Sequence, residues 1–173
     1  MDLSPETHTV ADVLRLLHLA PLPHEGGFFR RTAESADLVE SPLGRRRAWS
    51  AILALFTPDA FSAMHRLRQD EIWCFHAGDP LEIVHLAPDG SGGRVILGRD
   101  AERGQHMQDV VPARTWQGAR VMPGGRWSLV SCVVAPEFAW NDFEAGRADV
   151  LCAAYPQFED IIRALVRAAP PAQ

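Results

Sequence analysis

The segment FSAMHRLRQDEIWCFHAGDPLEI, residues 61–83, decides how the chain is expected to fold. It contains the strand-length apolar runs SAMHRL and EIWCFHAG and the start of a third, PLEIVHLA, with only short polar turns between them. Gly78, Asp79 and Pro80 form the second turn, since glycine ends the strand, aspartate can bond its own backbone and proline cannot continue a strand. His65 and Glu71 stand at the heads of two strands joined by a tight turn, so we expect their side chains to lie close together.

Similar short runs fill the middle of the chain. They are rich in valine, isoleucine, phenylalanine and tryptophan, and Gly, Pro and Asp separate them: GGFFRRT, WSAILALF, RVILG, DVVPARTW, GARVM and WSLVSCVVAP. The segment APDGSGGR between two of the runs is typical of a hairpin turn, because Asp-Gly and Gly-Gly supply positive φ angles. This pattern predicts an all-β sandwich or barrel, with its core over about residues 24–145.

Helical periodicity occurs only at the two ends. Near the start, Thr9 can cap a run of apolar residues at helical spacing, namely Val10, Val13, Leu14 and Leu17. Near the end, a second apolar face consists of Phe158, Ile161, Ile162, Leu165 and Val166. We therefore expect helices at about residues 9–19 and 157–168, flanking the barrel of a single domain that spans residues 1–173.

Composition excludes several classes of protein. The chain of 173 residues is 47% hydrophobic and 23% charged, which is ordinary for a soluble globular domain. A formal net charge of −5 argues against a nucleic-acid partner, and the basic run Arg45, Arg46 and Arg47 is expected to be a solvated loop. No apolar run approaches the roughly 18 residues of a membrane span, and the first residues lack a signal-peptide profile, so a cytoplasmic protein is expected. Three cysteines without close spacing predict reduced thiols.

The spacing of polar residues resembles the first of the two motifs of the cupin superfamily. That motif has a glycine, five residues, His-x-His, three or four residues, Glu, six residues and Gly. Here His65, Leu67, Glu71 and Gly78 take the last four places, so that Leu67 stands where cupins have the second histidine. Asp59 replaces the first glycine.

A second stretch resembles the second cupin motif. Pro112 matches the motif's proline, whereas Arg114, Gln117 and Val121 replace its glycine, histidine and asparagine. Over residues 12–166 the chain is similar to one cupin branch, cupin family five, through PHEGGFFRRT, SAILALF, the opening segment, QDVVPARTWQGAR, VSCVVAPEFAWNDFE and YPQFEDIIRAL. The resemblance implies a double-stranded β-helix, or jelly-roll barrel, commonly dimeric, with a pocket between its two sheets. It does not imply a reaction.

The residues that match the cupin ligands allow two kinds of chemistry. His65, Glu71 and Gln117 form a reduced metal set that would hold a divalent ion such as manganese, iron, nickel or zinc with help from water or substrate. Without a metal, His65 would act as a proton-transfer base, because an unperturbed imidazole has a pKa of about 6.5, and either Glu71 or Asp70 would orient or charge it. The metal-free dTDP-4-dehydrorhamnose 3,5-epimerases are similar cupins with a histidine base near this part of the barrel.

Other polar and aromatic residues are candidates for contacting a ligand. Glu25 and Arg30 flank the pair Gly26-Gly27, and glutamines can orient a polar group. Tryptophan side chains can either stack on a sugar or base ring or pack in the core. The full set of expected ligand-binding residues is Glu25, Arg30, Trp73, Phe75, Gln108, Trp116 and Gln117.

Two classes of function follow from this sequence. The first is an enzyme, an epimerase or isomerase acting on a carbohydrate or nucleotide-sugar by proton transfer at His65. The second is a non-catalytic module that binds or senses a small molecule in the same pocket. In both, we expect a homodimer formed through sheet edges, and no nucleic-acid or membrane partner.

Overall fold

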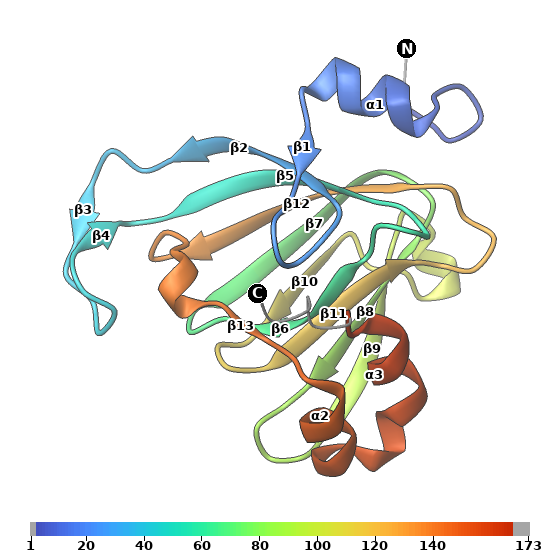
Figure 1. Cartoon of the computed structure of the whole chain (residues 1–173). Helices are drawn as coiled ribbons and strands as arrows, with labels where there is room; N and C mark the ends of the chain where they lie inside the picture. Colours follow the sequence, from blue (N-terminus) through green and yellow to red (C-terminus); the bar gives the residue numbers. More distant parts are fainter. Residues whose placement is uncertain (1–2, 168–173) are drawn as a thin grey trace, which may run out of the picture.

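Two antiparallel sheets face each other in the computed structural model, which describes residues 3–167 (Figure 1). The six-stranded sheet has the order β1 (Ala20–Pro21), β2 (Phe28–Glu34), β5 (Ser50–Phe56), β12 (Ser128–Ala135), β7 (Asp70–Gly78) and β10 (Gln108–Val111). The five-stranded sheet has the order β13 (Glu144–Ala145), β6 (Ser62–Arg66), β11 (Trp116–Val121), β8 (Leu81–Leu86) and β9 (Gly92–Leu97). This arrangement confirms the predicted all-β jelly-roll barrel.

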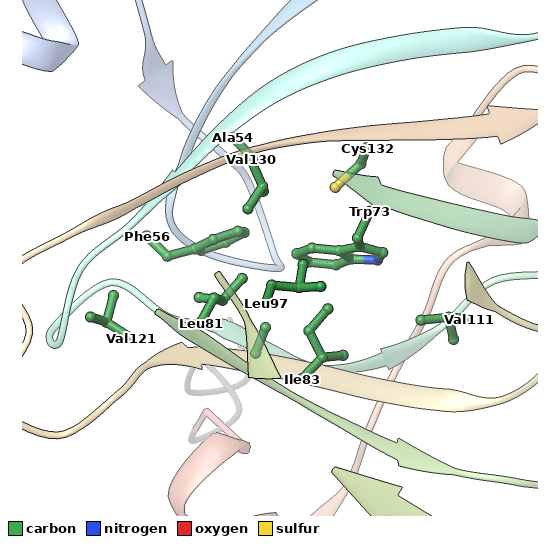
Figure 2. Packing of buried hydrophobic residues seen from close by; sticks show 11 residues of the cluster. Ala54, Phe56, Trp73, Leu81, Ile83, Leu97, Val111, Val121, Val130 and Cys132 are labelled. Carbon is green, nitrogen blue, oxygen red and sulfur yellow. The ribbon is translucent and has the colours of Figure 1, made fainter. Parts of the chain in front are cut away.

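The core fills one end of the space between the sheets. Large apolar side chains from both sheets meet there, with Phe56 and Trp73 stacked at a ring distance of 5.8 Å and Leu81 and Ile83 facing them (Figure 2). Inward-facing positions nearer the other end of the same strands carry smaller or polar side chains, such as Ser50 on β5. The barrel is therefore packed solid at one end and hollow at the other.

Helices cover the outside of the barrel. The predicted N-terminal helix is α1 (Val10–Leu17), and Thr9 begins it with a capping box in which Thr9 and Asp12 bond each other's backbone. The predicted C-terminal helix is shorter, α3 (Glu159–Leu165), and follows the 3₁₀ turn η3 (Pro156–Phe158). Residue 168 of the predicted range lies outside the described residues. Helix α2 (Ala148–Ala154) was not predicted, and it packs with α3 on the five-stranded sheet.

The predicted turns connect strands as expected. The segment after β8 is a hairpin turn, since β8 and β9 pair antiparallel from Leu81–Leu97 to Leu86–Gly92. Gly78, at the end of β7, has a φ of +98°, and a Cβ there would collide with Trp127. Only glycine fits this position, which explains the Gly-Asp-Pro sequence that follows the second strand of the opening segment.

The basic run of residues 45–47 corrects one sequence expectation. Arg46 and Arg47 form strand β4 (Arg46–Arg47), which pairs with β3 (Leu38–Val39) in a ribbon that extends away from β2 and β5 (Figure 1). Arg46 makes an ion pair with the buried carboxylate of Asp142, so it is not a solvated loop charge. A buried carboxylate needs such partners, and its charge draws the arginine inward.

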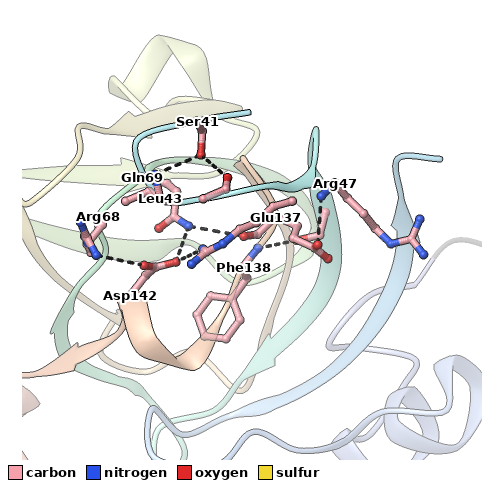
Figure 3. Close-up of polar contacts among 11 residues, drawn as sticks. Ser41, Leu43, Arg47, Arg68, Gln69, Glu137, Phe138 and Asp142 are labelled. Atoms are coloured by element: carbon pink, nitrogen blue, oxygen red, sulfur yellow. Dashed lines mark hydrogen bonds and ion pairs between the residues drawn. The ribbon is translucent and has the colours of Figure 1, made fainter. Parts of the chain in front are cut away.

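Polar contacts anchor the segment that follows β12 (Figure 3). Gln69 Nε2 donates to Asp142 Oδ2 over 2.9 Å, and the backbone N–H of Arg47 donates to Glu137 Oε1 over 3.0 Å. The backbone N–H of Phe138 donates to Ser50 Oγ over 3.1 Å. These bonds fix the 3₁₀ turn η2 (Trp140–Asp142) and its flanking residues beside the open end of the barrel. The remaining short element is η1 (Ala101–Arg103), between β9 and β10.

Within residues 3–167, none of the helices is both long enough and apolar enough to cross a membrane.

Candidate functional site

A cavity of about 360 Å³ occupies the hollow end of the barrel. Strands of both sheets supply its wall, and the loops before β2, after β6 and after β12 complete it. Its apolar lining consists of Leu22, Phe29, Ile52, Leu67, Val134, Phe138 and Trp140. Its polar lining consists of Glu25, Arg31, Ser50, His65, Glu71 and Cys132. A mostly apolar hollow with a few convergent polar groups is typical of a small-molecule site.

His65 lies on β6 and is only 1% exposed. Its Nδ1 is 2.8 Å from the backbone oxygen of Ala63, and in the neutral ring this nitrogen carries the proton and donates to that carbonyl. Nε2 is then an acceptor, and no residue within 3–167 occupies it. The ring of Phe143 stacks on the imidazole at 5.1 Å with an interplanar angle of 18°. Orientation and tautomer of His65 are thus both set by its surroundings.

Glu71, on β7, is held by a short chain of hydrogen bonds. Gln117 Nε2 donates to Glu71 Oε2 over 2.6 Å, and Trp73 Nε1 donates to Gln117 Oε1 over 3.0 Å. An indole nitrogen can only donate, so it fixes which way the Gln117 amide points. The amide therefore presents its N–H, and not its oxygen, to the carboxylate.

Burial controls the charge of Glu71. The loss of solvent raises the pKa of Glu71 to about 7; the charge of His65 opposes this rise and the charge of Glu25 adds to it. Hydrogen bonds from Gln117 and from the thiol of Cys132 lower the pKa by smaller amounts. Near neutral pH, Glu71 therefore exchanges between its acid and its carboxylate form. Burial also raises the pKa of Cys132 well above its usual range, which keeps this residue a thiol.

The residues that match the cupin metal ligands do not fit a metal centre. Gln117 Oε1 already accepts from Trp73, and Leu67 brings an apolar side chain to the cavity in place of the second histidine. Across residues 3–167, no group of three or more His, Cys, Asp or Glu side chains is placed to hold a metal ion. Of the four positions that match the cupin ligands, only His65 and Glu71 thus offer a ligand atom, whereas manganese, iron, nickel or zinc sites use three or four protein ligands.

Three of the sequence-predicted site residues lie together in the cavity or at its floor. His65 and Glu71 line the cavity, and Gln117 supports Glu71 from behind. A fourth, Glu25, also lines it, and Ser62 Oγ donates to Glu25 Oε1 over 2.7 Å. The motif spacing thus pointed to side chains that lie around one cavity, and their role in binding or catalysis stays a prediction.

The other predicted ligand-binding residues do not line the cavity. Trp73 and Phe75 share the inward face of β7 with Glu71, but Trp73 lies deeper, in the packed core, and Phe75 packs against that core. Trp116 is adjacent to Gln117 and so faces the opposite side of β11, where it packs among the helices with the Arg66 guanidinium 4.4 Å above its ring.

Strand alternation also explains the placement of the two remaining candidates. Phe29 and Arg31 line the cavity from β2, so Arg30 between them points away and is exposed. Gln108 is exposed on β10, and its Nε2 is 3.2 Å from Cys74 Sγ. Neither side chain can contact a ligand held in this cavity.

Several lining residues were not predicted. Three pairs at i and i+2 face the cavity, namely Phe29 and Arg31, Ser50 and Ile52, and Cys132 and Val134. This two-residue period is the signal that would have found them, provided the inward face of each strand were known. Leu22, Leu67 and Phe138 lie in loops and Trp140 begins the short 3₁₀ turn η2, so no strand period marks them.

Comparison with solved structures defines the class of protein. The chain resembles a cupin 2 domain-containing protein from Halorhodospira halophila with a TM-score of 0.55 at 12% identity, covering 84% of this chain and 86% of that one. Oxalate decarboxylase from Bacillus subtilis gives a TM-score of 0.53 at 13% identity, covering 89% of this chain and 41% of that one. At such identities these likenesses show the fold alone, and the fold is that of a cupin.

The family is narrower than the fold. The family model described as Cupin superfamily (DUF985) matches residues 11–146, so the chain belongs to that family. A hypothetical protein from Leishmania major is 35% identical with a TM-score of 0.87, covering 93% of this chain and 100% of that one. A protein from Shewanella oneidensis is 34% identical with a TM-score of 0.84, and the match covers 94% of this chain and 99% of that one. No curated protein matches the sequence.

Proposed function

We propose that this cupin binds a small molecule in the cavity and that His65 and Glu71 exchange protons with it. One observation carries the proposal: a histidine with a free Nε2 and a buried carboxyl group with a pKa of about 7 line the same cavity. The cavity volume of about 360 Å³ lies within the range of roughly 300–1,000 Å³ that small-ligand sites have.

The pair suits an isomerase or epimerase reaction. A neutral imidazole accepts a proton at Nε2, and a carboxyl group that titrates near pH 7 can return a proton or stabilise negative charge on the ligand. Moving a proton from one atom of a ligand to another requires both an acceptor and a donor. His65 and Glu71 supply these two roles without a metal ion.

The lining favours a ligand with an apolar body and one polar end. Each buried hydroxyl or phosphate of a nucleotide-sugar would need a hydrogen-bond partner, and much of this wall has none to offer. The one arginine of the lining, Arg31, already pairs with Glu34 at 2.8 Å and lies 3.8 Å from Glu137. The carbohydrate or nucleotide-sugar expected from the sequence is therefore less suited than a smaller and less polar molecule.

A non-catalytic binding protein is the second candidate, and the largely apolar wall favours it, since such a wall binds without supplying reactive groups. The two candidates differ in one measurable property. Proton transfer in D2O washes deuterium into a bound ligand at carbon, whereas simple binding leaves the ligand unlabelled.

The test is a panel of small amines, ketones and hydroxy acids incubated with the protein in D2O and followed by proton NMR. A catalytic cupin labels at least one compound, and His65→Gln abolishes labelling while binding of that compound changes by less than about tenfold. Glu102→Gln, an exposed carboxylate on η1, is the matched control and should behave as the unaltered protein. Binding without labelling in every case would support the second candidate and contradict the first.

A further inference from the structure

The polar groups of the cavity carry more negative than positive charge. The charge of Arg31 is balanced by Glu34, which also pairs with Arg47 at 3.1 Å, and by the nearby Glu137. Glu25 and Glu71 line the cavity, and neither makes an ion pair with an arginine among residues 3–167. A ligand that brings positive charge would therefore be attracted to this end of the barrel.

Three acceptors line the same cavity. Glu25, His65 and Glu71 all contribute side chains to its wall. Ser62 donates to one oxygen of Glu25, and Gln117 and the thiol of Cys132 donate to Glu71. A carboxylate has about four acceptor sites, so each of the two keeps acceptor capacity toward the cavity. His65 is almost fully buried, and its Nε2 has no hydrogen-bond partner among the described residues.

We propose that the polar end of the ligand is a primary ammonium group, whose N–H bonds are accepted by Glu25, Glu71 and Nε2 of His65. An ammonium has three donors and no acceptor, which matches this set of three acceptors. A carboxylate or phosphate would instead meet two carboxylates and no free cation. The proposal rests on the function proposed above, because it assigns the chemical class of the ligand for the same cavity.

The aromatic part of the lining suits the rest of such a ligand. Phe29, Phe138 and Trp140 line the cavity, and Trp140 packs edge-on against Phe138 with ring centroids 5.0 Å apart. Trp140 is 45% exposed, so part of its surface is free for contact at the entrance. An alkyl or aryl group attached to the ammonium would cover these rings, while the charge lies toward the carboxylates.

Three probes of the same size and different charge test the proposal: benzylammonium, benzyl alcohol and benzoate. Binding is followed at pH 8, above the pKa of Glu71 of about 7, through the imidazole NMR signals of His65. Benzylammonium should bind at least about tenfold more tightly than benzyl alcohol, and benzoate should leave the His65 signals unchanged. Glu25→Gln and Glu71→Gln should each remove about tenfold of the benzylammonium affinity and leave benzyl alcohol unaffected, whereas Glu102→Gln should change nothing.

The outcomes separate this inference from the proposed function. Equal or tighter binding of benzyl alcohol or benzoate at His65 would overturn the ammonium ligand and leave a small-molecule site. Tight binding of Mn²⁺, seen as broadening of the His65 signals that Glu25→Gln abolishes, would replace the ammonium with a metal ion. If none of the probes shifts the His65 signals up to about 10 mM, both proposals are wrong.

Discussion

The indole nitrogen of Trp73 donates a hydrogen bond of 3.0 Å to the side-chain oxygen of Gln117. Trp73 belongs to the packed core and Gln117 to the floor of the cavity, so this bond connects the solid end of the barrel with the hollow end. Because the indole fixes the amide, the amide N–H is directed to Glu71. Trp73, which does not line the cavity, therefore helps to set the charge of Glu71, which does.

Replacing Trp73 tests this connection. Trp73→Phe removes the only donor to Gln117 Oε1 that residues 3–167 provide, and an unpaired buried acceptor costs about 1–3 kcal/mol of unfolding free energy, in addition to the cost of the lost ring volume. A freed amide can turn its oxygen to Glu71, which favours the protonated acid and raises the pKa of Glu71 further. Urea unfolding and a carbon-13 NMR titration of Glu71 measure the two effects.

Trp127→Phe is the matched control for that variant. Trp127 is as buried as Trp73, at 1% exposure, and its indole donates to the backbone oxygen of His8 over 2.9 Å. We expect the control to lose stability and to leave the titration of Glu71 unchanged. An equal shift of the Glu71 titration in both variants would contradict the role given to Gln117.

The raised pKa of Glu71 predicts how stability depends on pH. The pKa rises from 4.5 to about 7 on folding, so between these values the native state binds a proton that the unfolded chain has lost. This contribution to stability is fully present below pH 4.5 and disappears as the pH rises through 7, a loss on the order of 3 kcal/mol. Glu71→Gln removes the ionisation, so the variant should be more stable than the unaltered protein at pH 8. Urea unfolding between pH 5 and pH 8 measures the unfolding free energy of both proteins. An equal change of that free energy with pH in the two proteins would refute the prediction.

The incomplete metal set predicts a gain of metal binding by a single substitution. Leu67 lines the cavity together with His65 and Glu71, so Leu67→His adds the imidazole that cupins have at this position. We expect elemental analysis to find a divalent transition metal near one equivalent in this variant after incubation with Mn²⁺ or Zn²⁺, and well below one equivalent in the unaltered protein. A stoichiometric metal in the unaltered protein that His65→Ala loses would contradict the account of the site.

The open edge of β2 predicts a homodimer. Strand β1 pairs only with Phe28 and Phe29 of β2. Within residues 3–167, the rest of β2 pairs with β5 and has no strand on its other side. Free strand edges are commonly covered by another chain, and Leu38 on the neighbouring ribbon is 55% exposed. Light scattering should give twice the 19.1 kDa of one chain, and Leu38→Glu should shift the equilibrium toward monomer. A mass of one chain at every concentration would disprove the dimer.

Fixed spacing indicated which polar side chains would lie near one another. His65 and Glu71 line the same cavity because a short turn joins their strands, and Gln117 lies beside them because β11 pairs with β6 at His65. Spacing does not tell which face of a strand points inward, and for that reason Trp116 and Arg30 were assigned to the wrong side. It also does not tell how deep a side chain lies, so Trp73 was expected at the cavity and lies in the core.

The pKa of Glu71 and the presence of helix α2 were harder to predict than the positions of the site residues. The pKa of Glu71 depends on burial by both sheets, which only the folded chain provides. Helix α2 was missed because it presents a single fully buried residue, Leu151, and therefore a weak apolar period.

We propose that His65 and Glu71 form an acid–base pair that operates near neutral pH. The most direct test is one NMR titration of the unaltered protein that follows the Glu71 carboxyl carbon and both imidazole nitrogens of His65. The account predicts that Glu71 titrates near pH 7 and that the neutral ring of His65 carries its proton on Nδ1. Titration of Glu71 near 4.5, with the proton of His65 on Nε2, would contradict it.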